Sequence, residues 1–415
     1  MSRFLIAASA LTASALVQGA NWTPSSPLVQ IGNDCDIYFD SAASLEVTDN
    51  LYSSSTKTSA TSWMVTPGLL LEYGKDSALS ATFSAKRTFV NFTDSALSDL
   101  EDSRDALSLG IRFADGGPLS LSVDSSYRVT ARNDDLQMQG LGGILGATLA
   151  RQANYSHAFR ADYKLTEKLS IGLGFTNTYN HYLDPTVIVN AFSNYNTNTL
   201  TELNTKSIPL SFDYQAFEKL SFGLALQHDV TDYSAAPYFS TDPSATTRPA
   251  LTNKQLVKNF AGLTAKGQLT ESGKLNANIR VGYSQYHYDS AANDSDLSYA
   301  VSLNHVLTER LSHSLTLSRD VTASSTNTQM ASKNYTYGMA YTASEDLNFN
   351  LSATKSDVFA STSQVDTYIY SLGADYKYSK HLTFQASYTM NDSTASVATS
   401  TYTSNAFTLS AAFRY

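Results

Sequence analysis

Apolar residues recur at every second position along most of this chain. The pattern is plain at residues 169–176, 220–227 and 297–304, where large apolar residues alternate with small or polar ones. A β-strand points successive side chains to opposite faces, so each segment predicts a strand with one apolar face. Residues 405–415 alternate in the same way, and their apolar side ends on the final residue, Tyr415.

These alternating segments are numerous and long. About 18 of them can be traced, each about 9–15 residues in length. Strands of soluble sheets usually have about five or six residues, whereas strands that cross a bilayer at a tilt need about 9–11. Beyond the N-terminus there is no apolar run of the roughly 18 residues that a spanning helix needs. The lengths therefore favour strands that cross a membrane.

The connections between the segments alternate between short and long. Tight turns are expected at residues 74–77, 166–168 and 308–310, and long Ser/Thr/Asn/Asp-rich loops at residues 177–204 and 231–253. Outer-membrane barrels have this asymmetry, with short periplasmic turns and longer outer loops. An even number of strands would place both chain ends on the periplasmic side.

A soluble sandwich also has alternating strands, so alternation alone does not decide the fold. Three features favour a barrel: long strands, small uncharged residues on the polar side, and Tyr or Phe near the ends of the apolar side. Lipid tolerates no unpaired strand edge, so the sheet must close. We predict an all-β fold, a transmembrane antiparallel up-and-down β-barrel of about 18 strands (16–18). A barrel of that size leaves an aqueous interior.

The N-terminal residues predict export from the cytoplasm. Arg3 precedes an apolar stretch at residues 4–17, and Gln18-Gly19-Ala20 is a small-residue cleavage site. We therefore expect a signal peptide at residues 1–20, a periplasmic N-terminal lead-in at residues 21–34 and the barrel at residues 35–415.

Composition excludes several classes of protein. The chain has 415 residues and a net charge of -9, and 16% of its residues are charged, against roughly 25% in soluble domains. Mild acidity argues against a nucleic-acid partner, which would favour a basic patch. A single Cys, Cys35, cannot build a disulfide framework.

Ionisable residues occur on the polar side of the predicted strands. A basic side chain on the lipid face costs about 2–4 kcal/mol at the midplane, so we expect these residues to face the lumen. They either line a pore that sorts solutes or are paired wall charges without a selective role. Because both signs occur, no strong ion preference is expected. The candidates are Asp124, Arg128, Arg160, Asp162, Lys164, Asp213, Asp229, Lys266, Arg280, Asp375, Lys377 and Arg414.

One expected outer loop, at residues 134–149, is less polar than the others. By our count it is the third outer loop. One hypothesis is that it folds inward and constricts the lumen, and the alternative is a surface cap or a tip that rests on the membrane. Its apolar residues are Leu136, Met138, Leu141, Ile144 and Leu145.

The sequence shows no pattern of catalysis. None of the seven His residues has metal-ligand spacing to another His or to Cys35. Ser is so common that an imagined Ser-His-Asp arrangement carries no information. We therefore expect no catalytic residue, no cofactor and no metal, and predict that the protein is not an enzyme.

Two segments resemble a known family. Cys35-Asp36-Ile37-Tyr38-Phe39 through residues 47–52, followed by residues 65–74, resembles the start of the β-barrel porin 2 family of Gram-negative outer-membrane proteins. The resemblance implies a barrel in the cell outer membrane, and some members of the family are associated with polysaccharide export. Phe413 and Tyr415 are similar to the C-terminal signal that the barrel-assembly machinery reads.

These patterns together predict a porin-like channel for passive diffusion of small hydrophilic solutes. The alternative is a non-channel barrel that is an accessory to polysaccharide export, or has a structural or surface-binding role. The expected partners are outer-membrane lipid and lipopolysaccharide, the barrel-assembly machinery and small hydrophilic solutes, with no nucleic acid.

Overall fold

The computed structural model describes residues 26–51, 53, 55–75, 77–114, 116–131, 151–183, 201–235, 254–270, 272–289, 294–323, 329–360, 363–396 and 401–415. The expected signal peptide at residues 1–20 lies outside the described residues. Among the described residues, no helix has the length and hydropathy needed to span a bilayer.

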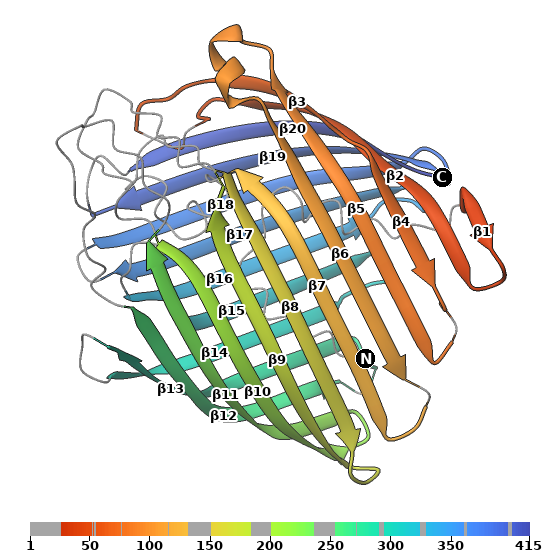
Figure 1. The fold of residues 1–415 in the computed structure, drawn as a ribbon, viewed down its shortest axis with the longest axis vertical. Coiled ribbons are helices and arrows are strands. Elements are labelled where there is room, and N and C mark those ends of the chain that lie inside the picture. The colour runs from red at the N-terminus through yellow and green to blue at the C-terminus, as the bar shows by residue number, and fades with distance from the viewer. Residues whose placement is uncertain are drawn as a thin grey trace.

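The described chain is almost entirely β-strand, arranged as one antiparallel sheet that closes on itself (Figure 1). Counting β3 and β4 as one strand and leaving out the short β1, the ring has 18 strands. The strands are β1 (Val29–Ile31), β2 (Cys35–Thr48), β3 (Ala60–Thr66), β4 (Gly68–Tyr73), β5 (Leu79–Phe92), β6 (Asp102–Ala114), β7 (Leu119–Ala131), β8 (Arg151–Lys164), β9 (Leu169–Tyr182), β10 (Thr201–Phe217), β11 (Leu220–Ala235), β12 (Gln255–Gln268), β13 (Leu275–Tyr288), β14 (Asp294–Val306), β15 (Leu311–Ala323), β16 (Gln329–Thr342), β17 (Leu347–Ala360), β18 (Ser363–Lys377), β19 (Leu382–Ala395) and β20 (Tyr402–Arg414).

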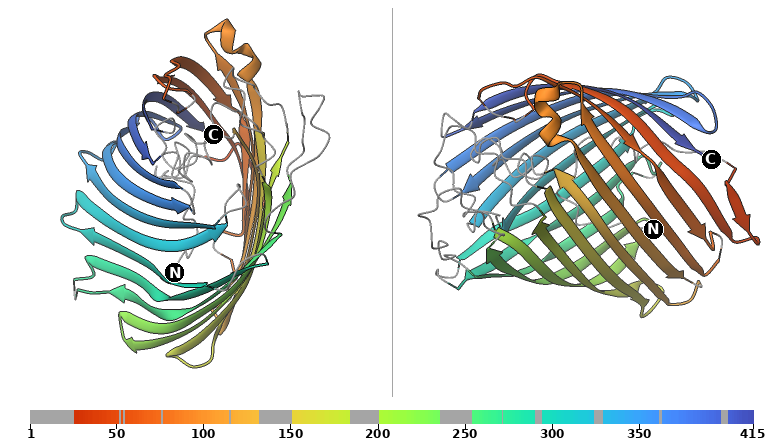
Figure 2. Two further views of the ribbon diagram at one scale, coloured as in Figure 1. Left: turned by 90° about the vertical axis from the view of Figure 1, so that its left-hand side faces the viewer. Right: turned by 45° about the horizontal axis from the view of Figure 1, so that its top comes forward.

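The barrel closes where the first long strand, β2, pairs with the last, β20. Their ladder runs from Asp40 opposite Arg414 to Thr48 opposite Ala406. Beyond it, the Phe39 N–H donates to the Tyr415 carbonyl at 2.7 Å, and the Tyr415 N–H donates to the Phe39 carbonyl at 3.0 Å. The aromatic C-terminal residue is therefore the last rung of the closing seam. In both views of Figure 2 the strands follow one another around a single ring.

The residues preceding the barrel also form structure. In the segment expected as a periplasmic lead-in, β1 pairs with the first residues of β2, with Ile31 opposite Cys35. It continues the sheet past the end of β20. The lead-in thus covers the edge of β2 that β20 is too short to reach.

The second barrel strand is interrupted at Pro67, between β3 and β4. Proline has no N–H to donate, so the ladder loses a hydrogen bond there. The register continues unchanged on both sides, with Val65 opposite Phe89 and Gly68 opposite Lys86. A Cβ on Gly68 would lie 2.7 Å from both the Asp40 carbonyl oxygen and Lys86 Cγ, so only glycine fits.

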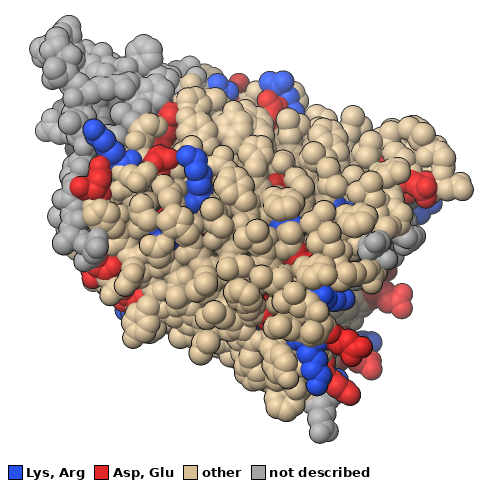
Figure 3. All heavy atoms as spheres, turned by 60° about the horizontal axis from the view of Figure 1, so that its bottom comes forward, with Lys and Arg blue, Asp and Glu red and all other residues tan. Residues whose placement is uncertain are grey.

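The two faces of the sheet differ as the alternation predicts. Large apolar side chains such as Leu45, Leu173, Leu263 and Leu372 are exposed on one face, and ladder partners share a face throughout. Figure 3 shows this outer surface as a broad area of uncharged residues, with charged side chains gathered mainly toward its edges. An exposed apolar belt on a closed barrel is the surface that lipid covers, which places the protein in the outer membrane.

The predicted strands and turns are confirmed, and the short turns mark the periplasmic end. The expected long loops are shorter than predicted. Residues 177–182 belong to β9, residues 201–204 to β10 and residues 231–235 to β11. Their polar residues, mainly Thr and Asn, are common in loops, but the ladders continue through these segments because a strand needs no apolar face where it leaves the lipid. One 3-10 helix, η2 (Ser95–Leu100), joins β5 to β6, and the Asp94 side chain caps it by accepting from the Ala96 N–H.

At the outer end of the seam, Asp49 joins β2 to β20. Its carboxylate accepts from the Asn405 N–H at 2.7 Å, from Asn405 Nδ2 at 2.9 Å and from Lys57 Nζ at 2.6 Å. Burial alone would raise the pKa of Asp49, but the hydrogen bonds from Lys57 and Asn405 outweigh it and lower the pKa to about 2.

Replacing Asp49 with Asn should therefore lower the stability of the folded barrel near neutral pH. The loss should be at most about 1 kcal/mol, because the ion pair is solvent-exposed and screened. A depressed pKa stabilises the folded state above the unfolded pKa near 4, and this contribution is lost as the pH falls toward 2. The difference between Asp49→Asn and wild type in heat-modifiable gel mobility should thus vanish near pH 2. Glu309→Gln, in the turn after β14, is the control, and a difference independent of pH would contradict the assignment.

Candidate functional site

The inner face of the barrel is the candidate functional site. A concave face is identified by side chains that meet across non-adjacent strands. Lys258 on β12 lies 3.0 Å from Asp320 on β15, and Arg280 on β13 donates to Gln227 on β11 at 2.8 Å. Side chains on a convex face would diverge over the same strands. The polar face therefore points into the barrel.

At the periplasmic end of the closing seam, three charged side chains on the inner face link the strands. Asp40 on β2 lies 2.9 Å from Lys86 on β5 and 3.2 Å from Arg414 on β20. The Asp40 side chain is only 9% exposed, so water competes little for it. The Asp40–Lys86 contact passes Gly68, where a side chain would collide with Lys86. The trio links strands on both sides of the seam.

Other charges on the inner wall are also paired. Arg112 on β6 meets Asp124 on β7 at 2.7 Å, and both side chains are about half exposed. Arg160 and Asp162, two residues apart on β8, meet at 2.6 Å and lie over Gly172, whose missing side chain leaves them room. Partial exposure of these pairs is consistent with a solvated wall.

Charged side chains on strands further around the ring also have polar partners. Lys266 on β12 lies 2.9 Å from Asp213 on β10. Asp375 on β18 has amide partners instead, accepting from Asn350 at 3.0 Å and from Gln385 at 2.9 Å. The Lys266–Asp213 pair is locally neutral, whereas the amides around Asp375 hold its side chain without cancelling its charge.

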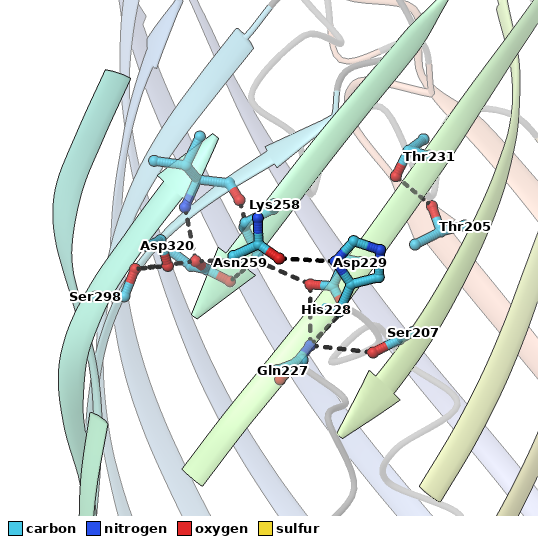
Figure 4. A network of polar contacts seen from close by, with 12 residues as sticks. Thr205, Ser207, Gln227, His228, Asp229, Thr231, Lys258, Asn259, Ser298 and Asp320 are labelled. Carbon is cyan, nitrogen blue, oxygen red and sulfur yellow. Dashed lines mark hydrogen bonds and ion pairs between the residues drawn. The ribbon is translucent and has the colours of Figure 1, made fainter. Parts of the chain in front are cut away.

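A polar network occupies the outer end of β11, β12 and β15 (Figure 4). Lys258 lies between two carboxylates, 3.6 Å from Asp229 and 3.0 Å from Asp320. Asp229 also accepts from Gln227 at 2.8 Å, and Asp320 accepts from Ser298 at 3.3 Å. The Lys258 and Asp229 side chains are 13% and 12% exposed, whereas Asp320 is 45% exposed, so the network is shielded at Lys258 and Asp229 and open to water at Asp320.

The network spans a place where the barrel wall is not laddered. Pairing between β14 and β15 ends at Tyr299 and Arg319. Each strand continues toward the outer end with its other neighbour, β14 with β13 to Asp294 and β15 with β16 to Ala323. Side chains span the interval: Ser298 and Lys258 contact Asp320, and Arg319 pairs with Asp296. A buried cluster lies beside it, formed by Leu203, Tyr233, Leu256, Tyr286, Tyr288 and Val321.

The described inner positions on β16 and β17 carry no charge. Most bear hydroxyl, amide or small side chains, such as Asn334, Thr336, Asn350 and Thr354, which share a face through the ladder, and Val358 on the same face is apolar. Thr336 and Thr354 hydroxyls lie 3.1 Å apart. The lumen wall is therefore charged over some strands and hydroxyl-lined over others.

All twelve charges named from the sequence lie on one face by strand register. Besides the contacts above, Arg280 stacks over the Phe260 ring at 3.7 Å. Arg128, Lys164 and Lys377 alternate with apolar residues in the same way. Sequence reasoning missed Asp40, Lys86, Arg112, Lys258 and Asp320, although strict alternation along β5 and β6 would have found Lys86 and Arg112.

The expected constriction residues Leu136, Met138, Leu141, Ile144 and Leu145 lie outside the described residues.

The structure adds one pair of histidines that sequence spacing missed. His305 and His313 lie opposite each other across the β14–β15 turn, with ring nitrogens 3.0 Å apart. Among the described residues, no three or more His, Cys, Asp or Glu side chains are grouped so that they could hold a metal ion.

Comparison with known proteins adds only general similarity. No family model matches the chain, and no curated protein matches it. Among solved structures, the FrpB iron transporter of Neisseria meningitidis (F5-1 variant, apoprotein form) is 12% identical at a TM-score of 0.47, covering 88% of this chain. This chain spans only 62% of the FrpB chain.

Two other solved structures are similar to the chain at the same level. The ferric-catecholate import receptor Fiu of E. coli K12 is 10% identical at a TM-score of 0.46, covering 94% of this chain and 82% of its own. OpdQ of Pseudomonas aeruginosa is 9% identical at a TM-score of 0.48, covering 92% and 97%. At these scores the similarities carry no functional argument, and the barrel assignment rests on the strand ladders.

The trio around Asp40 generates a stability prediction. Asp40→Asn leaves Lys86 and Arg414 without their shared carboxylate in a poorly solvated place, which should destabilise the folded barrel by about 1–3 kcal/mol. Asp124→Asn, in a half-exposed pair, should change stability by less than about 1 kcal/mol. Urea unfolding of the detergent-folded protein, followed by gel mobility, measures both. Equal effects of the two substitutions would contradict the role assigned to Asp40.

Proposed function

We propose that the protein is a passive channel for small hydrophilic solutes across the outer membrane. The observation that carries the proposal is a closed ring of 18 strands whose inward face carries hydroxyls, amides and charges, among them the oppositely charged pairs Arg112–Asp124, Arg160–Asp162 and Lys266–Asp213. A barrel of this size is too wide for its own side chains to fill, so its interior holds water. A polar wall lets hydrated solutes pass without binding any of them strongly.

The pairing of the wall charges supports weak ion selectivity. Arg112, Arg160 and Lys266 each have a carboxylate within 3.0 Å. A solute at the centre of the lumen then experiences a nearly cancelled field, because opposite charges a few ångströms apart act as dipoles rather than as net charges. The channel should therefore discriminate by size more than by sign.

We also propose that the chain is a member of the β-barrel porin 2 family. The support is the resemblance over residues 35–52 and 65–74, which include β2, the last two residues of β3, and β4, beside the closing seam.

Reconstitution in a planar bilayer tests the channel. We expect stable open steps and a reversal potential near zero in a KCl gradient. Changing Asp124 and Asp162 together to Asn leaves Arg112 and Arg160 without their partners, so the reversal potential should shift toward anion preference.

The control is Asp232→Asn, which removes a carboxylate from the outer-face pair with Lys206 and should leave selectivity unchanged. A folded, heat-modifiable barrel that gives no current would instead support a non-channel role, such as an accessory to polysaccharide export.

A further inference from the structure

A groove crosses the outer face of the barrel beside the closing seam. One depression of about 300 Å³ lies over β19, β20, β2 and β3, and its lining includes Ala43 and Ala411. A second, of about 540 Å³, is lined by Phe39, Pro67, Leu69, Ala85, Leu107 and Tyr127, among others. Phe39 and Pro67 line both, so the two depressions adjoin. The groove exists because alanines and a proline stand where neighbouring strands carry Leu and Phe.

A polar cap lies at one end of the larger depression. Arg87 on β5 is the ladder partner of Asp105 on β6, with Arg87 Nε 3.5 Å from Asp105 Oδ1. Arg87 Nη2 also donates to Ser103 Oγ at 3.0 Å. The Arg87 side chain is 54% exposed, and it shares the outer face with Ala85 and Phe89.

The position of the cap relative to the membrane follows from a row of tyrosines. Tyr127, Tyr155 and Tyr179 on β7, β8 and β9 lie side by side on the outer face, with successive ring centroids 5.0 Å and 6.1 Å apart. Such aromatic rows mark the boundary between lipid and water. Leu107 is the ladder partner of Tyr127, and Asp105 is the next outward-facing residue toward the outer end. The cap therefore lies at the level of the lipid headgroups, with the groove below it among the acyl chains.

We propose that this groove binds a phosphorylated lipid of the outer leaflet, the chemistry of lipopolysaccharide. A guanidinium at headgroup level binds phosphate through several N–H groups, and Arg87 retains donors that Asp105 and Ser103 do not take. An acyl chain of the same molecule lies over Ala85 and Leu69. The polar cap toward the outside and the apolar groove below it match the orientation of an outer-leaflet lipid.

Asp105 gives the site an internal test. Its carboxylate holds Arg87 in place, but it also repels a phosphate. Removing the carboxylate should strengthen binding, whereas removing the guanidinium should weaken it. A purely structural ion pair would give the two substitutions the same sign.

Native mass spectrometry of the full chain in detergent, titrated with bisphosphorylated lipid A and with its dephosphorylated form, tests the proposal. Arg87→Gln should lower lipid A binding about tenfold, the loss of a charge-assisted contact. Asp105→Asn should raise binding. Ala85→Trp fills the groove and should lower binding although Arg87 is retained. Lys206→Gln removes an outer-face cation elsewhere on the barrel and should change nothing.

Three outcomes would overturn the proposal. Equal binding by Arg87→Gln and Lys206→Gln would show that Arg87 does not hold the phosphate. Equal binding of the dephosphorylated lipid would show that the groove binds lipid through apolar contacts alone and that the phosphate contributes nothing. A dimer that Ala85→Trp abolishes, without lipid, would assign the groove to a second copy of the chain. If Arg87→Gln fails to fold by heat-modifiable mobility, Arg87→Lys and Asp105→Asn keep the test decisive.

Discussion

The structure depends on one constraint, that a backbone N–H or carbonyl in lipid must have a partner. An open sheet would leave two edges unpaired, each losing several kcal/mol per exposed group. The chain meets the constraint by bringing its first and last long strands together, and the main-chain groups of Phe39 and Tyr415 complete that ladder. The Asp40 trio and the Asp49 contacts lie at opposite ends of the same seam. The seam between β2 and β20 is thus held by side-chain contacts at both of its ends as well as by its ladder.

The two faces of the sheet separate two kinds of chemistry. On the outer face, apolar side chains meet lipid, and charges such as Arg87 and Lys206 lie toward the outer ends of their strands. On the inner face, charges are tolerated because water solvates them and polar or oppositely charged side chains bind them. Small residues such as Gly68 and Gly172 make room for those inner pairs, so part of the wall's glycine content serves charge pairing rather than turns.

Much of this architecture could be predicted from alternation alone. The fold class, the strand count and the periplasmic turns follow from the period of two, because a one-residue slip would put every apolar side chain into water. The limits of β9, β10 and β11 could not be read in the same way, since Thr and Asn near the outer end occur equally in strands and loops. Pairings such as Lys258 with Asp320 also escaped prediction, because they join residues 62 positions apart on strands that are not neighbours. Curvature brings them together, and no local pattern encodes curvature.

The interval between β14 and β15 that lacks main-chain hydrogen bonds affects where the barrel wall first opens on heating. Main-chain ladders separate cooperatively, whereas the side-chain contacts around Asp320 can break one at a time. On heating, the separation of β14 from β15 should therefore begin at this interval and proceed toward the periplasmic end. It should precede the separation of β2 from β20 at Tyr415. The first opening would thus lie about a third of the way around the ring from the closing seam, six strands away in one direction and twelve in the other.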